Sequence, residues 1–371
     1  MAEALKFAEL FDSGTKPHPN PPLEGEGASE VAIVGGGPAG MALALALARH
    51  GIAAEIHDAR PRGAARGDQR VLALSHGSRQ TFEWLGVWPK IASSATPIDI
   101  IHISQQGGFG RTRITAREQG VPALGYVAAA ASIAAALDDA LDAAGIVYRD
   151  NARIEAVNAS AEQAWLRSAD GAQSAARLVV YAEGAIGSAG DTAGTETRDY
   201  GQHAVICNVT VATPHQHVAY ERFTPQGPVA LLPFGAPCDF ALVYTCPPAD
   251  AAKFAALPDA EFLAALQTHF GGRMRFTAAT RRHVFPLGLR YRKSPVGTRS
   301  VWLGNAAQTL HPVAGQGFNL ALRDIRDLAR SRWLLAYAAG FWAVTEALFL
   351  FGGTGPQVVL SLLNAMLLVV P

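Results

Sequence analysis

Three glycines near the start of the chain have the spacing of a dinucleotide-binding loop. Gly35, Gly37 and Gly40 form a G-x-G-x-x-G pattern between an apolar run and an Ala/Leu-rich run, and Asp58 follows. In such a loop the first glycine permits a tight turn, the second admits a pyrophosphate, and the third allows close helix packing. A carboxylate about 20 residues later holds ribose hydroxyls. The pattern predicts a bound dinucleotide, the alternative being a glycine-rich turn in another α/β protein.

A second glycine-rich stretch lies far along the chain, where residues 300–324 read SVWLGNAAQTLHPVAGQGFNLALRD. An apolar strand is expected to end at Gly304, and the side chain of Asn305 could hydrogen-bond a ligand there. The loop Pro312–Gly317 would let its backbone approach a flat ligand, and the following helix would present N–H groups. A two-ended cofactor such as FAD would need both stretches, whereas a Pro/Gly connector is the alternative.

Charge and cysteine content exclude several other kinds of protein. Lys and Arg together number 31, as do Asp and Glu, and no basic cluster with interleaved aromatics occurs, so no nucleic-acid partner is predicted. The three cysteines show no C-x-x-C spacing, which favours a reducing compartment over a disulfide scaffold. His215 and His217 could share one side of a strand, but no third ligand is in view. No metal site is therefore predicted.

Hydrophobic periodicity indicates the elements that must position these loops. Buried strands are expected at Val31–Val34 and Ala53–His57, and a DG turn should join two hairpin strands. The loop Pro61–Arg70 contains arginines that would either wrap a cofactor phosphate or lie in solvent. Further elements are expected as helices over 71–91, Ala128–Ala144 and Asp259–Phe270, and as strands over Ile98–Ser104, Arg111–Thr115, Ala164–Arg167 and Ala176–Val180.

The pattern changes between Tyr200 and Pro286, where short strands are separated by Pro/Gly turns, as in an antiparallel sheet. We predict an α/β fold with this sheet inserted. The segment Trp333–Phe351 would span about 28 Å as a helix, but its glycine and glutamate favour packing helices or a lipid-facing surface over a transmembrane helix. The expected domains are a disordered leader (1–30), a discontinuous dinucleotide domain (31–95, 126–199 and 285–330), a sheet domain (96–125 and 200–284) and an apolar helical C-terminal segment (331–371).

Several motifs in order resemble one family. G-N-A-A-Q, H-P and G-Q-G-F-N-L-x-L-R-D, all within residues 304–324, are similar to the flavin-dependent aromatic hydroxylases (class A monooxygenases). Within them the chain resembles the ubiquinone-biosynthesis hydroxylases of the 2-polyprenyl-6-methoxyphenol hydroxylase branch. Further matching stretches, spread between Val31 and Arg330, are Asp68–Leu74, Leu85–Trp88, Tyr220–Thr224 with Gly227-Pro228, and Phe285–Leu287.

This resemblance implies a fold and an activity. The fold would be an FAD-binding, Rossmann-like three-layer domain with an inserted antiparallel substrate sheet, like that of p-hydroxybenzoate hydroxylase. The activity would be hydroxylation of the aromatic ring of a polyprenyl phenol, with FAD as cofactor, NAD(P)H and O₂ as co-substrates, and a flavin C4a-hydroperoxide as oxidant. It further implies a cytoplasmic protein, with association at the inner membrane surface and with other quinone-biosynthesis proteins.

The resemblance also assigns roles to residues. The ADP half of FAD would be held by Gly35, Gly37, Gly40 and Asp58. Arg70 matches an arginine that contacts the cofactor, and Asn305 would face the ribityl chain. The isoalloxazine ring would lie beside a loop that includes Gly304, Pro312, Gly315, Gln316 and Gly317. Three residues are candidates for orienting the phenol, namely His203, Tyr220 and His311, and His311 is the preferred one because it precedes the flavin loop.

The chain departs from the family pattern at one cofactor motif. Glu183-Gly184 stands where the family has an Asp-Gly pair that is linked to flavin and nicotinamide, and Gly187 takes the place of a serine. These departures favour one alternative, a non-catalytic FAD-binding subunit of a quinone-biosynthesis assembly. A flavoprotein reductase of the same fold is a second alternative that stays open. The apolar wall of the substrate site, which must exclude water, is expected from Pro233, Phe234, Phe240, Val243 and Tyr244.

Overall fold

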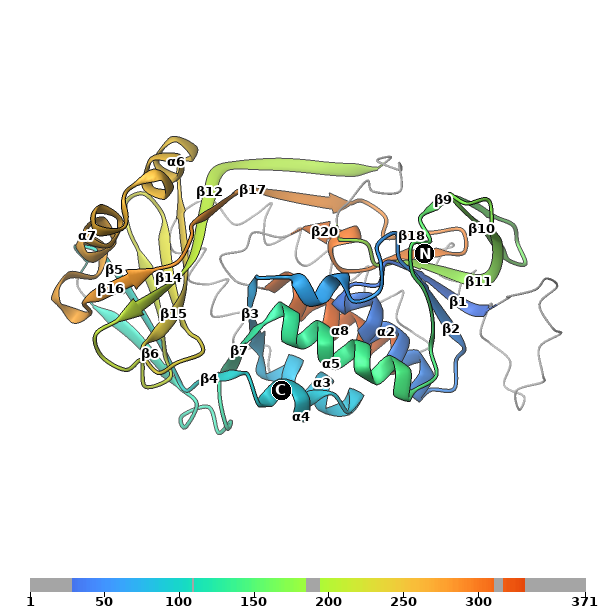
Figure 1. Ribbon diagram of the computed structural model, residues 1–371, viewed down its shortest axis with the longest axis horizontal. Coiled ribbons are helices and arrows are strands. Elements are labelled where there is room, and N and C mark those ends of the chain that lie inside the picture. The colour runs from blue at the N-terminus through green and yellow to red at the C-terminus, as the bar shows by residue number, and fades with distance from the viewer. Residues whose placement is uncertain (1–28, 109, 185–193, 310–315, 331–371) are drawn as a thin grey trace.

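The computed structural model describes residues 29–108, 110–184, 194–309 and 316–330. Over these ranges the chain forms three β-sheets, and helices cover two of them (Figure 1). The predicted leader before residue 29 and the C-terminal segment from residue 331 lie outside the described residues, as does the segment Trp333–Phe351. Among the helices that are described, none combines the length and the apolar character needed to cross a bilayer.

An eight-stranded sheet has a parallel centre in the order β18-β19-β11-β1-β2-β8. The predicted strand Val31–Val34 forms, and it begins two residues earlier than expected, at Ser29. The predicted hairpin around Asp170-Gly171 also forms, as β10 pairs antiparallel with β11. The strands are β1 (Ser29–Val34), β2 (Ala54–His57), β8 (Val147–Arg149), β9 (Ile154–Ala159), β10 (Ala164–Ser168), β11 (Gln173–Tyr181), β18 (Val296–Gly297) and β19 (Ser300–Trp302).

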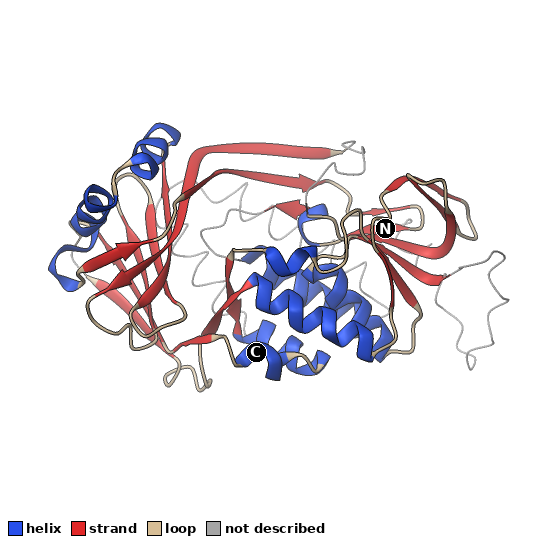
Figure 2. Ribbon diagram, viewed as in Figure 1, coloured by secondary structure: helices blue, strands red, loops and turns tan. Residues whose placement is uncertain are grey.

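The central strands are apolar on both sides, so both faces of this sheet must be covered. Helices cover one of these faces. Ile33 and Ile56 on that face share a buried core with Leu43, Leu137 and Ile325, which come from three different helices. The opposite face is covered by the β9–β10 hairpin, so the unit has three layers (Figure 2). The helices are α2 (Pro38–Arg49), α3 (His76–Leu85), α4 (Trp88–Ala92), α5 (Ala130–Ala143) and α8 (Gln316–Arg330), with the short 3₁₀ turns η1 (Ala64–Gly67) and η3 (Gly304–Ala306).

A three-stranded sheet corrects the helix expected over residues 71–91. The first five of these residues form β3 (Val71–Ser75), which pairs with β7 (Gly125–Ala129), and β7 pairs with β4 (Thr96–Ile98). The helix proper starts only after Ser75, whose hydroxyl accepts from the Ser78 N–H. Leu and Ala suit a helix locally, but the partner strand β7 supplies a hydrogen-bond ladder that local propensity does not anticipate.

A nine-stranded, largely antiparallel sheet has the order β20-β17-β12-β15-β14-β13-β5-β6. The sheet expected between Tyr200 and Pro286 is therefore present, and β5 joins β13 as a parallel neighbour. Its strands are β5 (Ile100–Gln105), β6 (Arg111–Thr115), β12 (Thr195–Val211), β13 (Val218–Phe223), β14 (Pro228–Pro233), β15 (Asp239–Cys246), β16 (Phe276–Ala279), β17 (His283–Arg292) and β20 (Gln308–Thr309), with α6 (Pro248–Ala256), α7 (Asp259–Phe270) and η2 (Gly271–Arg273).

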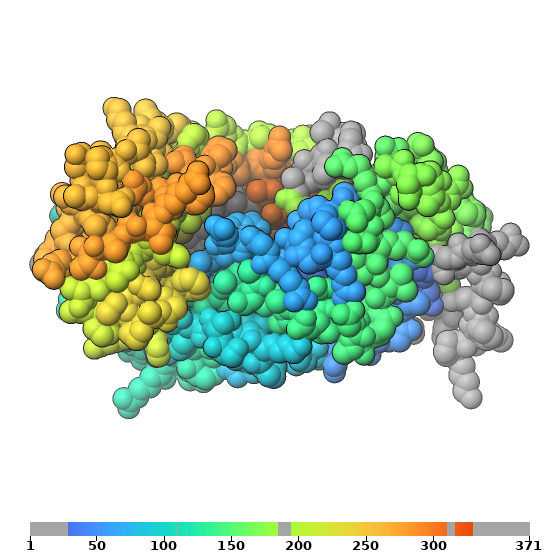
Figure 3. All heavy atoms as spheres, in the orientation of Figure 1, coloured from blue at the N-terminus to red at the C-terminus, as the bar shows by residue number. Residues whose placement is uncertain are grey.

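The two faces of the nine-stranded sheet have different neighbours. On the outer face, Leu242 and Val205 pack against Phe254 of α6 and Phe262 of α7. On the inner face, Ala219 packs with residues of the three-stranded sheet, and Figure 1 shows that sheet between the nine-stranded sheet and the helices. The surface is hollowed where β17 approaches the segment around β3 (Figure 3). The division into domains stays a prediction.

The prediction that five residues line one apolar wall is wrong, because side chains alternate between the two faces of the sheet. Phe240 and Tyr244 belong to the outer core, where the Tyr244 ring meets Phe254 at 5.0 Å between centroids. Pro233 pairs with Phe240 and so shares the outer face. Val243 lies on the opposite, inner face, and Phe234 packs against the inner cluster. Side chains on a strand point alternately to opposite faces, so a continuous apolar run cannot line one wall.

Candidate functional site

The first glycine loop is built so tightly that two of its three motif glycines leave no room for a side chain. Gly35 has φ +115°, and a Cβ there would lie 2.7 Å from the carbonyl oxygen of Ala182. A Cβ on Gly40 would lie 2.0 Å from the carbonyl oxygen of Gly35. The first glycine thus lets β1 turn against the neighbouring chain, and the third lets α2 start directly over that turn.

Gly37 faces open space, unlike its two neighbours in the motif. A Cβ built there would meet nothing within 4 Å among the surrounding atoms. Gly37 is also the N-cap residue of α2, and no side chain caps that helix end. The first turn carries no acidic residue and has a proline at its start. These features leave N–H groups and the positive end of the helix dipole directed at the open space, as anion binding requires.

Asp58 lies directly after β2, beside this loop, and its carboxylate is buried. Its Oδ2 accepts a hydrogen bond from the Gly36 N–H at 2.8 Å, and its Oδ1 accepts from the Arg60 N–H at 2.8 Å. The Arg60 guanidinium also donates to both oxygens. Burial opposes ionisation of Asp58, but the hydrogen bonds from Arg60 and Gly36 outweigh it and lower the pKa. The carboxylate is thus ionised, as binding of ribose hydroxyls requires.

Tyr148 also lies beside the glycine loop and Asp58, and the sequence did not indicate it. It lies on β8, which pairs with β2, and its hydroxyl contacts the Gly36 carbonyl oxygen and the Asp58 Oδ2, each at 3.4 Å. Burial raises the pKa of Tyr148, and the nearby charge of Asp58 raises it further. Only the pairing of β8 with β2 brings the phenol to the glycine loop.

Three stretches that are distant in sequence meet at the carboxyl ends of parallel strands. Val34 pairs with Tyr181, and Tyr181 pairs with Trp302, so β1, β11 and β19 end side by side. The predicted motifs follow these ends directly, with Glu183-Gly184 after β11 and Gly304-Asn305 after β19. Ligands of open α/β sheets bind at this edge.

The second glycine stretch lies beside the first and contacts the segment after β11. The Asn305 side-chain amide donates to the Gly184 carbonyl oxygen at 3.4 Å. A Cβ on Gly304, whose φ is +59°, would lie 3.8 Å from the Cβ of Ala39 in α2. On Gly317, beside Gln316 at the start of α8, a Cβ would lie 3.8 Å from the Asn305 Oδ1. The two stretches therefore form one continuous site.

This site extends across four neighbouring strands in the order β19-β11-β1-β2. Asn305 lies at one side and Asp58 at the other, with the Gly35 turn between them. Three inter-strand spacings amount to roughly 14 Å. A ligand that contacts both sides must be long and must have two different ends.

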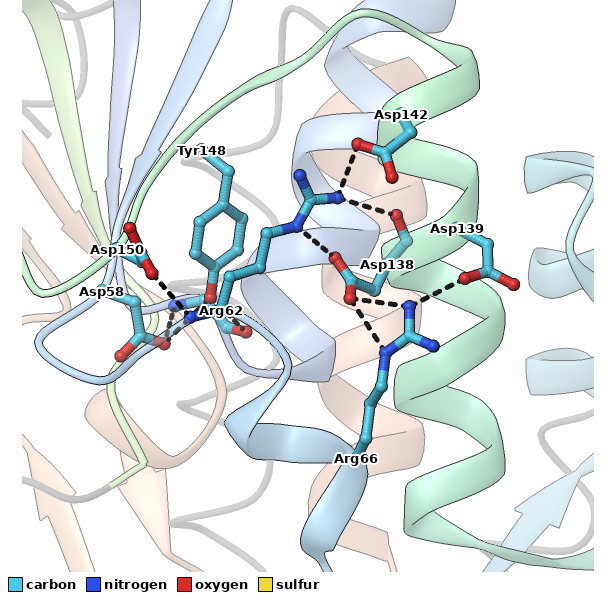
Figure 4. Close-up of polar contacts among 9 residues, drawn as sticks. Asp58, Arg62, Arg66, Asp138, Asp139, Asp142, Tyr148 and Asp150 are labelled. Carbon is cyan, nitrogen blue, oxygen red and sulfur yellow. Dashed lines mark hydrogen bonds and ion pairs between the residues drawn. The ribbon is translucent and has the colours of Figure 1, made fainter.

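The arginines of the loop Pro61–Arg70 pair with acidic side chains. Arg62 Nε donates to Asp138 Oδ1 at 2.7 Å, and Arg66 donates to Asp138 Oδ2 at 2.8 Å (Figure 4). Asp138 lies on α5 and is 5% exposed, so the loop is fixed to that helix. Arg70, which the resemblance assigned to the cofactor, is largely exposed and pairs with Asp68 at 2.6 Å.

Four of the residues considered as metal ligands or as phenol-orienting groups lie on elements away from this site. His215 and His217 are in the turn between β12 and β13, and not on a strand as expected, since His217 has φ +58°. His203 shares the outer face with Val205, and Tyr220 packs in the outer core against Phe240. His311, Pro312 and Gly315 lie outside the described residues.

Comparison with known proteins identifies the family. A family model described as an FAD binding domain matches residues 28–348. The chain belongs to this family. It is 30% identical to the 3-demethoxyubiquinol 3-hydroxylase of Escherichia coli (strain K12) over 81% of this chain and 78% of the relative. It is also 30% identical to the ubiquinone hydroxylase UbiL of Rhodospirillum rubrum, over 85% of this chain and 76% of the relative.

Solved structures share the fold. P. aeruginosa PqsL in complex with 2-aminobenzoylacetate aligns with a TM-score of 0.68 at 22% identity, covering 84% of this chain and 88% of that one. The p-nitrophenol 4-monooxygenase PnpA from Pseudomonas putida aligns at 0.65 and 17% identity, covering 90% and 88%. These matches confirm the predicted fold class, and with the hydroxylase relatives they confirm the assignment to FAD-dependent aromatic monooxygenases.

The residues present fit FAD, which is the cofactor of this family. The open space at Gly37 and the uncapped start of α2 suit a pyrophosphate, and the ionised Asp58 suits a ribose. At the other side, Asn305 and the backbone beside Gly317 offer hydrogen-bonding groups and no bulky side chain. The two different ends of the site match a dinucleotide with unlike halves.

Proposed function

We propose that this chain is an FAD-dependent NAD(P)H monooxygenase that hydroxylates the aromatic ring of a polyprenyl phenol in ubiquinone biosynthesis. One observation carries the proposal: two glycine-rich stretches, remote in sequence, lie side by side at the carboxyl edge of the parallel sheet. The relatives named as ubiquinone-pathway hydroxylases support the substrate class. An aromatic ring bound near the flavin end would lie between this edge and the nine-stranded sheet.

In this proposal the two sides of the site have separate roles. Asp58 and the Gly35–Gly40 turn hold the ADP half of FAD, and Asn305 holds the ribityl chain. The flavin side further includes Glu183, Gly184, Gly304, Gln316 and Gly317, while Pro312, Gly315 and His311 stay sequence-based predictions. Arg70 would reach the cofactor only after release from Asp68.

The chemistry divides between the cofactor and the protein. Bound FAD supplies the electron transfer and the activation of O₂. The protein must keep water from the reacting atoms, which an apolar wall does. The inner face of the nine-stranded sheet would provide such a wall, because Ile101, Ala219 and Leu232 line it and pack toward the three-stranded sheet.

We further infer that NAD(P)H reduces the flavin and that the protein acts at the cytoplasmic surface of the inner membrane, where a polyprenyl tail is held. The support for NAD(P)H is the family resemblance, with Glu183 in place of the usual aspartate. The acidic charge is kept at that position, and one methylene is added.

Purified protein tests the proposal directly. It should be yellow, it should oxidise NAD(P)H faster when a 6-methoxyphenol analogue is added, and it should form a hydroxylated product only in the presence of O₂. Product formation without O₂ would favour a reductase. Bound flavin that NAD(P)H cannot reduce would favour a non-catalytic subunit, and a colourless protein that takes up no FAD would remove the premise.

A further inference from the structure

Glu221 is a carboxylate on the inner face of the nine-stranded sheet. It lies on β13, where it pairs with Ala230 of β14 and with Ile103 of β5. Partners across a ladder share a face, and residues two apart on a strand share a face as well. Ala219 is two residues before Glu221 and packs against Val127 of the three-stranded sheet. Glu221 therefore points to the side of the sheet where the FAD-binding strands lie.

The carboxyl group of Glu221 has no partner within the described part of the chain. Part of the side chain remains accessible, but Oε1 is buried and makes no hydrogen bond. Burial raises the pKa of Glu221 to about 8. The adjacent Arg222 does not compensate it, because Arg222 points to the other face and donates to the Ser104 hydroxyl. A buried, unpaired carboxyl is costly for folding, so its presence needs a reason other than packing.

The surroundings of Glu221 are apolar on the same face. Ala230 and Ile103 flank it, and Val243 follows Ala230 in the next ladder. An apolar wall that offers a single hydrogen-bond acceptor, the Glu221 carboxyl group, is complementary to a flat apolar ring that carries one hydroxyl group. Of the three candidates from sequence, His203 and Tyr220 lie on the outer face and cannot meet such a ring, and His311 lies outside the described residues.

We propose that Glu221 binds the hydroxyl group of the phenolic substrate and accepts its proton. The inference rests on the proposed function, since it assumes a phenol. The phenol O–H bond breaks and an O–H bond forms on Glu221, while the electron pair stays on the phenolate oxygen and enriches the ring for attack by an electrophilic oxygen. The pKa of a phenol is about 10, so the raised pKa of Glu221 reduces the free-energy gap for this transfer.

Paired probes test the role of the carboxylate. The binding of a methoxyphenol and of its O-methylated counterpart, which has no hydroxyl, is measured by the change in flavin absorbance of the FAD-loaded protein. At pH 9, where Glu221 is largely ionised and the phenol is not, the wild type should prefer the phenol by about tenfold or more, as a hydrogen bond to a charged group provides. Glu221→Gln should lose this preference, whereas Glu221→Asp, which retains a carboxylate, should restore part of it.

Tyr220→Phe is the matched control, because it removes a hydroxyl from the adjacent residue on the outer face. It should keep the full preference of the wild type. The proposal is overturned if Glu221→Gln keeps that preference, or if the wild type binds both probes equally. In those two cases hydroxylation by the wild type can still stand, so the proposed function survives. If the wild type binds neither probe and forms no product, the proposed function fails, and the role of Glu221 fails with it.

Discussion

At the scale of single residues, the glycine loop separates positions needed for folding from a position needed for the ligand. A methyl group on Gly40 would lie 2.0 Å from a backbone carbonyl oxygen, whereas a methyl group on Gly37 would enter open space. The same substitution at these two positions should therefore have different consequences. Both glycines belong to one sequence motif, which does not distinguish them. The contrast between them therefore comes from their contacts in the folded protein.

Gly37→Ala should fold with nearly unchanged stability and bind FAD at least about tenfold more weakly, because its methyl group enters the space for the pyrophosphate. Gly40→Ala should lower the free energy of unfolding by about 2 kcal/mol or more, because a carbonyl oxygen must move. Thermal melts of the apoprotein and FAD titration measure the two effects. Equal stability losses in both variants would contradict the assignment.

Glu221 makes the stability depend on pH in a stated direction. Its pKa is raised to about 8 in the folded protein from an ordinary value of 4.5. Between these values the folded state binds more protons than the unfolded state, so the contribution of Glu221 to stability falls as pH rises through this window.

Glu221→Gln should therefore be more stable than the wild type at pH 9, by about 1 kcal/mol or more, and not at pH 4. Urea unfolding at the two pH values measures the difference. Glu196→Gln is a suitable control, since this glutamate is exposed and pairs with Lys293, which lowers its pKa. A pH-independent difference between Glu221→Gln and the wild type would show that Glu221 is not a buried acid.

At the scale of elements, one carboxylate fixes a loop to a helix. Asp138 on α5 accepts from Arg62 and Arg66, both of which come from the loop after β2 (Figure 4). Asp139 and Asp142 add partners from the same helix. This contact positions the segment that leads from Asp58 to β3, so it supports the Asp58 side of the site without contacting it.

Asp138→Ala should lower the free energy of unfolding by about 1–2 kcal/mol, because two arginines lose hydrogen bonds to a buried charged partner. Asp142→Ala should cost less than about 0.5 kcal/mol, since that side chain is 68% exposed. Denaturant unfolding compares the two variants. Similar losses would mean that burial of Asp138 contributes nothing.

The element scale also shows where sequence reasoning succeeded. The order of apolar run, glycines and Ala/Leu-rich run correctly predicted β1 and α2. The Asp-Gly turn correctly predicted the β10–β11 hairpin. The helix expected from residue 71 failed for its first five residues, because β7 pairs with them. Pairing partners are remote in sequence, and the local pattern of Val71–Ser75 does not reveal them.

At the scale of the whole molecule, the position of each site residue follows from the order of strands. Asn319 of α8 illustrates the long-range links, because its Oδ1 accepts from the Ser75 N–H and from the Ser78 hydroxyl. This contact joins α8 to the end of β3 and to the first turn of α3. The two halves of the FAD-binding unit are thereby held together across more than 200 residues of sequence.

The sequence alone determined the glycine loop, Asp58, the second glycine stretch and the family, because each depends on residue types at short spacings that dictate local backbone conformation. The tertiary structure decided which strand ends meet, which arginines are paired, and which face of the nine-stranded sheet is covered by helices. Alternation along β13 put Tyr220 and Glu221 on opposite faces, but only the packing of α6 and α7 determined that the Glu221 face is turned toward the FAD-binding strands. The environment of a side chain is set by remote segments, and for that reason Glu221 emerged only from the fold.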